Sequence, residues 1–142
     1  MRYLVLVSHG TFAPGLHSVL DMLVGKRDDI LSTSLEDGMG ADVYVQNLKD
    51  KIKVIGPDDS VFLFGDIIGG SPLTNAINVI TEAGLLPHTH IFGGMNLPMA
   101  MTVAFGDEMS DDELAASVVE EGRGALQEFV VELGDDDDEE DL

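Results

Sequence analysis

The stretch Leu4-Val5-Leu6-Val7-Ser8-His9-Gly10 closes an apolar run that begins near Arg2. A short run of this kind, rich in β-branched residues, is typical of a strand that is covered on both faces of a parallel sheet. Ligands of such sheets bind at the carboxyl ends of the strands. Because His9 follows the run directly, we predict that a ligand can reach its side chain and that His9 carries the chemistry of this chain.

Length and composition are those of one globular domain. A chain of 142 residues can bury a core without disulfides or a structural metal. The sequence contains no Cys, which excludes thiolate metal sites and cysteine nucleophiles and favours a reducing compartment, so we expect a cytoplasmic protein. No segment approaches the ~20 apolar residues that span a bilayer, and the amino-terminal run is too short for a signal peptide.

The sequence is strongly acidic. The chain has 27 acidic and 7 basic residues, for a formal net charge of -20. Residues 135–142 hold 7 of the acids, which leaves -13 for the rest. We therefore expect a domain over residues 1–134 and a disordered, solvated acidic tail over 135–142. Such a surface repels nucleic acids and anionic membranes and favours a protein partner with a positive face.

The chain alternates between strand and helix patterns. Short apolar runs predict strands at residues 2–7, 30–35, 61–64 and 89–92. Between and after them, apolar residues recur at helical spacing over about 16–24, 41–52, 73–80, 98–105 and 114–129. Residues 129–133 could instead form a last short strand.

Two helix starts have recognisable caps. Ser71 is expected to cap the third helix, with Pro72 as its first residue. Ser110 and Glu113 have the spacing of a capping box in front of the last helix.

Repeated βα units indicate an α/β fold with a doubly wound, mainly parallel sheet and helices on both faces. The two most apolar strands, at residues 2–7 and 61–64, should be central, which predicts the strand order 2-1-3-4. The switch point then lies between the first and third strands. The loop of His9 and the loop from Asp66 to Ser71 should therefore emerge side by side.

These two loops suit a phosphoryl group. Asp66 can hold one ring nitrogen of His9 so that the other nitrogen is the nucleophile. The turns Gly10-Thr11 and Gly69-Gly70-Ser71 offer backbone N–H groups and hydroxyls at helix starts, where an anion binds well. The sequence has no Walker-type phosphate loop, so we expect no cofactor, no metal and no direct use of ATP, and a phosphohistidine protein as the donor.

The chain resembles the IIA domains of the mannose-type class of the bacterial phosphoenolpyruvate:sugar phosphotransferase system. The resemblance covers nearly the whole chain. It rests on the strand-His-Gly start at residues 5–10, on Asp66-x-x-Gly-Gly-Ser-Pro, on Gly-Gly-Met-Asn-Leu-Pro at 93–98, and on Glu-Gly-Arg at 121–123.

The resemblance implies that His9 accepts a phosphoryl group from the phosphocarrier protein HPr and passes it to a histidine of the IIB component, while the membrane components IIC and IID admit the sugar. It also implies that Asp66 orients His9 and that Gly70 and Ser71 contact the phosphoryl oxygens. Known members form dimers by exchanging a carboxyl-terminal strand, and residues 129–133 match that strand. The protein would then be cytoplasmic and peripheral to the membrane through its transporter. The acidic tail departs from the family pattern.

Three other functions fit the same residues. One is the phosphotransfer subunit of a dihydroxyacetone kinase, whose IIA-like domain is similar. The second is a regulatory module that holds a nucleotide or a phosphorylated metabolite in the same crevice. The third is a metal-dependent hydrolase that uses His9, Asp66 and His90.

Overall fold

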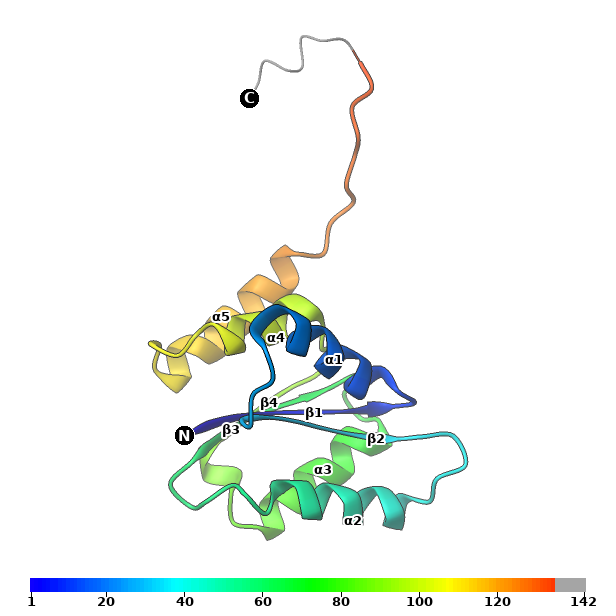
Figure 1. The fold of residues 1–142 in the computed structure, drawn as a ribbon, viewed down its shortest axis with the longest axis vertical. Coiled ribbons are helices and arrows are strands. Elements are labelled where there is room, and N and C mark those ends of the chain that lie inside the picture. The colour runs from blue at the N-terminus through cyan, green and yellow to red at the C-terminus, as the bar shows by residue number, and fades with distance from the viewer. Residues whose placement is uncertain (135–142) are drawn as a thin grey trace.

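The computed structural model describes residues 1–134, so the predicted tail at 135–142 lies outside the described residues. Four strands form one sheet in which every neighbouring pair is parallel. They are β1 (Arg2–His9), β2 (Ile30–Leu35), β3 (Ser60–Gly65) and β4 (Thr89–Phe92). Their order is β2-β1-β3-β4 (Figure 1), which confirms the predicted topology and places the switch point between β1 and β3.

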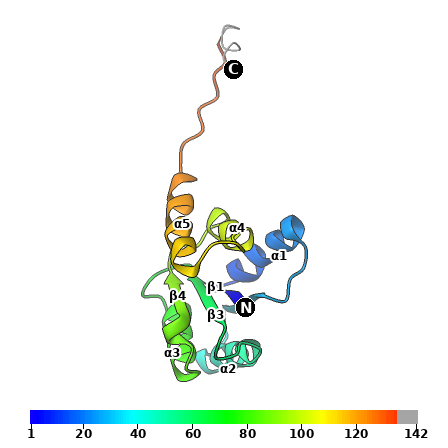
Figure 2. The same cartoon turned by 90° about the vertical axis from the view of Figure 1, so that its left-hand side faces the viewer.

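Helices cover both faces of the sheet. They are α1 (Phe12–Val24), α2 (Ala41–Ile52), α3 (Ser71–Glu82), α4 (Leu97–Ala104) and α5 (Asp111–Gly124), and a short 3₁₀ helix, η1 (Leu86–His88), precedes β4. In Figures 1 and 2, α1, α4 and α5 lie on one face and α2 and α3 on the other. None of the helices described is long and apolar enough to cross a bilayer.

The central strand β1 is buried on both faces. Leu4 and Leu6 join the cluster under α1, α4 and α5, whereas Val5 and Val7 join the cluster under α2 and α3. All four side chains are at most 2% exposed. Full burial of such a side chain contributes about 2 kcal/mol. The uninterrupted apolar run therefore reflects a strand that faces two cores.

The last helix is shorter than its apolar spacing predicts. It ends at Gly124, and residues 126–134 form neither helix nor strand in this chain. Gly122 and Gly124 lower the helix propensity at this point. Beyond them the apolar side chains find no core in their own chain, since Phe129 is 86% exposed.

The two predicted caps differ in outcome. Ser110 accepts a hydrogen bond from the Glu113 backbone and Glu113 bonds back to Ser110, so the capping box is confirmed. Ser71 does not cap α3, because Gly70 occupies the N-cap position and Ser71 is the first helical residue. The tight Gly-Gly turn shifts the helix start by one residue relative to the prediction.

Candidate functional site

The candidate site lies at the carboxyl edge of the sheet, over the two central strands. His9 is the last residue of β1, and Asp66 follows the last residue of β3. The register pairs Val7 with Gly65, so the two side chains leave adjacent strand ends. The strand order thus brings together two residues that are 57 positions apart in the chain.

Asp66 holds His9 through two hydrogen bonds to one oxygen. The His9 ring Nδ1 lies 2.9 Å from Asp66 Oδ2, and the His9 backbone N–H donates to the same oxygen at 3.0 Å. The other oxygen, Oδ1, accepts from the backbone N–H of Ile67 at 2.9 Å. Because a carboxylate only accepts, the neutral ring in this geometry carries its proton on Nδ1 and its lone pair on Nε2.

The burial of the two side chains is unequal. The Asp66 side chain is 12% exposed and the His9 side chain 48%. Partial burial alone would raise the pKa of Asp66, but the hydrogen bonds from the His9 backbone, the His9 ring and the Ile67 backbone outweigh it and lower this pKa. Asp66 is therefore an anion at neutral pH that holds the ring of a solvent-accessible histidine.

Glycines shape the turns around this pair. Gly10 and Gly69 have φ values of +58° and +87°, a left-handed conformation that favours glycine. Gly70 has an ordinary φ, but a Cβ built on it would lie 3.0 Å from His9 Cε1. The Gly70 backbone therefore packs against the imidazole ring, and a larger residue would move the ring.

Two helices start at the same edge as His9. Thr11 occupies the N-cap position of α1 without a side-chain capping bond. Ser71 opens α3, and its hydroxyl accepts a hydrogen bond from Asn75 Nδ2 at 3.0 Å. The first N–H groups of a helix lack partners within it and attract anions. The predicted phosphoryl-binding residues Gly10, Thr11, Gly69, Gly70 and Ser71 thus lie in the turns that lead into these two helices.

Sequence reasoning missed two features of the site. The buried hydroxyl of Ser8 accepts from the Ala13 backbone N–H at 2.7 Å and fixes the turn from β1 into α1. Phe12 at the start of α1, and Ile67 and Ile68 in the loop after β3, are large apolar residues that remain exposed. The signal for the second feature was the Ile-Ile pair inside a loop, where apolar residues are uncommon.

The other histidines stand apart from His9. His17 on α1 is half-buried, and its Nδ1 lies 2.7 Å from Ser32 Oγ. Burial lowers the pKa of His17, against the opposing effect of Asp21. The His90 ring lies 5.1 Å from the Phe62 ring at a tilt of 33°, and His90 Nε2 lies 3.6 Å from Asp112 Oδ1, so the structure does not join His90 to His9 and Asp66. Within residues 1–134 no group of three His, Cys, Asp or Glu side chains could hold a metal ion.

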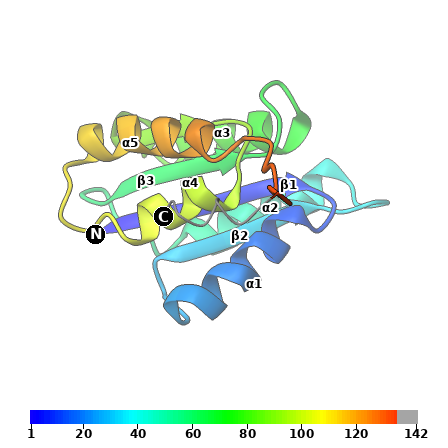
Figure 3. The same cartoon turned by 90° about the horizontal axis from the view of Figure 1, so that it is seen from above.

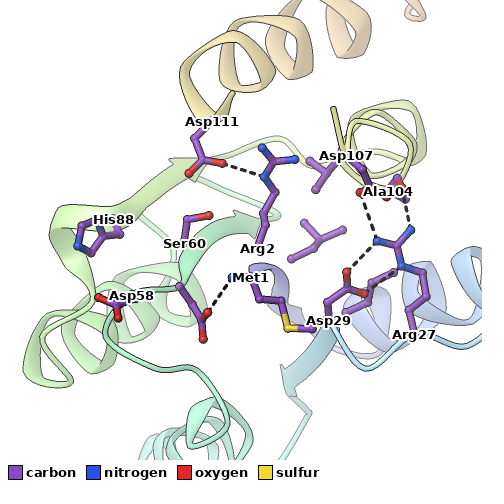
Figure 4. A pocket seen from close by; sticks show the side chains of 14 residues that line it. Met1, Arg2, Arg27, Asp29, Asp58, Ser60, His88, Ala104, Asp107 and Asp111 are labelled. Carbon is purple, nitrogen blue, oxygen red and sulfur yellow. Dashed lines mark hydrogen bonds and ion pairs between the residues drawn. The ribbon is translucent and has the colours of Figure 1, made fainter. Parts of the chain in front are cut away.

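A cavity of about 520 Å³ opens at the opposite, amino edge of the sheet (Figure 4). Its cations are already paired. Arg2 donates to Asp111 and to two backbone carbonyls, Arg27 donates to Asp29 and Ala104, and the Met1 ammonium lies 2.9 Å from Asp59. The Arg2 contacts tie the start of β1 to the segment between α4 and α5 and to the first residue of α5.

Comparison with known proteins gives one family and several related folds. A family model described as the fructose IIA component of the phosphotransferase system matches residues 3–119. The mannose/sorbose-specific IIA subunit of the phosphotransferase system from Enterococcus faecalis is 27% identical, with a TM-score of 0.78 over 92% of this chain and 96% of that chain.

Two further structures show the same fold at lower identity. The phosphotransferase component EIIA from Streptococcus agalactiae is 20% identical, with a TM-score of 0.77 over 90% of this chain and 97% of that chain. The IIA protein associated with the fucose utilization operon of Streptococcus pneumoniae is 24% identical, with a TM-score of 0.73 over 89% of this chain and 92% of that chain.

Proposed function

Because the chain belongs to the family of fructose IIA components of the phosphotransferase system, we propose that it is a phosphohistidine carrier with His9 as the phosphorylated residue. The observation that carries this proposal is the 2.9 Å hydrogen bond between His9 Nδ1 and Asp66 Oδ2, in a pair whose histidine is half exposed. With Nδ1 protonated, Nε2 is the nucleophile of a ring that a partner can reach.

The transfer needs no cofactor. The Nε2 lone pair of His9 attacks the phosphorus of a phosphohistidine on HPr, and the N–P bond to HPr breaks as the new N–P bond forms. The HPr imidazole leaves with the electron pair of the broken bond. Nδ1 of His9 keeps its proton, and the Asp66 carboxylate balances the positive charge of the phosphorylated ring. In the second transfer, a histidine of the IIB component attacks the phosphorus, and the bond between the phosphorus and His9 Nε2 breaks.

The turns around His9 supply stabilisation for the phosphoryl oxygens. The backbone N–H of Gly69, the hydroxyls of Thr11 and Ser71, and the starts of α1 and α3 are the candidate donors. The N–H groups of Gly10 and Gly70 already donate to the carbonyls of Leu35 and Ile67, so these two glycines would contribute by shaping the turns. No Lys or Arg side chain takes part in the described hydrogen bonds of this site. Cationic groups on the partner protein would supply the missing positive charge.

The partners follow from this role. HPr is the donor, IIB is the acceptor, and IIC and IID are the membrane components that the relay serves indirectly. The carrier would work in the cytoplasm, next to the membrane through its transporter complex. The negative surface of the domain suits a protein partner and not a nucleic acid.

We also propose a homodimer in which residues 129–133 of one chain lie on the other. These residues are exposed in the single chain. An apolar groove of about 620 Å³ lies beside β4 and α5, and its walls include Ile91, Phe92 and Val119. Light scattering should give twice the monomer mass for the full chain, and a variant that ends at residue 125 should be a monomer. A monomeric full chain would contradict this proposal.

The decisive experiment is phosphoryl transfer on purified proteins. Incubation with phosphoenolpyruvate, enzyme I and HPr should place one acid-labile, alkali-stable phosphate on His9. A His9→Ala variant should take up none, and a matched His88→Ala variant should behave as the wild type. Labelling that persists in His9→Ala would overturn the proposal. Transfer from His9 to IIB, with no transfer to a dihydroxyacetone kinase, would show that this carrier serves sugar uptake.

A further inference from the structure

The outer strand β2 presents unpaired backbone groups. Within residues 1–134, β2 pairs only with β1. The carbonyls of Asp29 and Leu35 accept from the backbone N–H groups of Leu4 and Gly10 on the β1 side. Because alternate residues of a strand bond to the same neighbour, the N–H and C=O groups of Ser32 and Ser34 face away from β1.

These groups line a groove of about 500 Å³. The helix α1 overhangs the β2 edge on one face of the sheet, and α2 lies on the other face (Figure 3). Pro14 of α1 forms one wall, Met39 and Asn47 form the other, and residues 32–34 form the floor. An extended backbone could lie along this groove beside β2.

The floor of the groove is polar and incompletely bonded. Ser32, Thr33 and Ser34 are each at most 9% exposed. Ser32 is engaged by His17, and Ser34 by Glu36, but Thr33 Oγ1 is buried with no hydrogen-bond partner among the described residues. A buried hydroxyl without a partner is unfavourable, so a bound group that reached it would be favoured.

The β2 sequence itself carries none of the residues that block strand addition. Edge strands normally carry Lys, Pro or a bulge that blocks pairing with another chain. The β2 sequence, Ile-Leu-Ser-Thr-Ser-Leu, has no charged residue and no Pro, and its pairing with β1 is continuous over six residues.

The groove runs to the candidate active site. The register pairs Leu35 with His9, and the Gly10 N–H donates to the Leu35 carbonyl at 2.9 Å. A segment bound along residues 32–34 would therefore end beside the phosphorylated histidine. Charge favours one class of segment. On the groove walls Asp50 is paired with Lys53 at 3.1 Å and Glu36 is balanced by Lys51, but the chain as a whole carries a net charge of -20. A second copy would add repulsion, whereas a basic segment would add attraction.

We propose that β2 is a docking edge for an extended segment, rich in Lys or Arg, of the partner protein that exchanges the phosphoryl group with His9. The segment adds a strand to the sheet through Ser32 and Ser34 and brings its protein to the His9 edge. This inference rests on the proposed function, since it names a docking site for the same transfer.

Amide exchange on the ¹⁵N-labelled protein tests the edge directly, with unlabelled HPr and IIB each added to saturation. In one of the two complexes, exchange at Ser32 and Ser34 should slow by about tenfold or more, as expected when amides that are not paired with β1 gain a hydrogen bond. Leu31 and Thr33, which already face β1, should change little. Unchanged Ser32 and Ser34 amides in both complexes would overturn the inference. Protection that rises with the protein's own concentration would assign the edge to a second copy and would overturn it equally.

A matched pair of variants separates docking from chemistry. Ser34→Pro removes the outward N–H, whereas Ser34→Ala removes only the hydroxyl. The Pro variant should bind the partner about tenfold more weakly than the Ala variant, the effect of one hydrogen bond. Both should react equally with phosphoramidate, a small phosphoryl donor that needs no docking.

If Ser34→Pro does not fold, the amide-exchange experiment on the wild-type chain decides. If HPr does not label His9 of the wild-type chain, the proposed function itself is contradicted. If labelling is normal but the amides of Ser32 and Ser34 gain no protection from exchange, only the docking edge is contradicted.

Discussion

At the residue scale, the charge of Asp66 is the first property to test. Asp66→Asn keeps the size of the side chain but removes the anion that balances a phosphorylated imidazolium. The amide can also donate to Nδ1 and so favour the wrong tautomer. We expect the rate of HPr-dependent labelling to fall by about a hundredfold. Rapid-quench labelling measures this rate, and Asp58→Asn, at an exposed acid on the opposite edge, serves as the control. Equal rates for the wild type and Asp66→Asn would show that the carboxylate has no part in transfer.

The same carboxylate predicts a pH dependence of stability. The folded protein lowers the pKa of Asp66 below its ordinary value of 3.8. The stabilisation from its hydrogen bonds is therefore fully present above pH 3.8 and is lost as the pH falls through the folded pKa. The difference in unfolding free energy between the wild type and Asp66→Asn should be constant near pH 6 and shrink in acid. Urea titrations at several pH values measure it, and a gap that widens in acid would show that the pKa is raised.

Substitutions at two neighbouring glycines should have different effects. At Gly70 the backbone tolerates a side chain, but a Cβ would press on the His9 ring at 3.0 Å. A Cβ built on Gly69 would meet no atom within 4 Å, but φ at this position is +87°, where a side chain is strained. Gly70→Ala should therefore slow transfer with little change in melting temperature, while Gly69→Ala should cost about 1 kcal/mol of stability. Thermal melts and labelling rates on the two variants check both statements, and the reverse pattern would refute them.

At the element scale, the loop after β3 offers exposed apolar contacts beside His9. Ile67 is 56% exposed and lies next to Gly70, which packs on the His9 ring, so a partner that docks on His9 would cover it. Ile67→Ser should slow labelling from HPr by about tenfold, because an apolar contact of the interface would be lost. Labelling from phosphoramidate should be unchanged. Met22→Ser, at an 83% exposed position on α1, is the matched control. Equal loss with both donors would mean that Ile67 supports the fold of the site and not the docking.

The elements also show what sequence alone could predict. Strand order followed from the apolar runs, because a strand with two buried faces must be central, and the meeting of the His9 and Asp66 loops followed from that order. The predicted end of the last helix was wrong. The spacing of Leu126 and Phe129 is helical, but neither side chain packs in its own chain. The contact between His17 and Ser32 was also hidden, since a helical pattern does not reveal which residue of the adjacent strand a half-buried side chain meets.

At the scale of the whole molecule, the excess of acids predicts that salt stabilises the fold. With 27 acids against 7 bases, most carboxylates have no cationic partner, and their repulsion acts against the compact state. Surface ion pairs contribute about 0 to 1 kcal/mol each, so their screening by salt is the smaller effect. The screening length falls from about 10 Å at 0.1 M salt to about 3 Å at 1 M. At a fixed protein concentration, the melting temperature should rise by about 5 °C or more between these two conditions. A variant that ends at residue 134 carries -13 and should gain less. A melting temperature that is flat or falls with salt would show instead that the few ion pairs outweigh the acid repulsion.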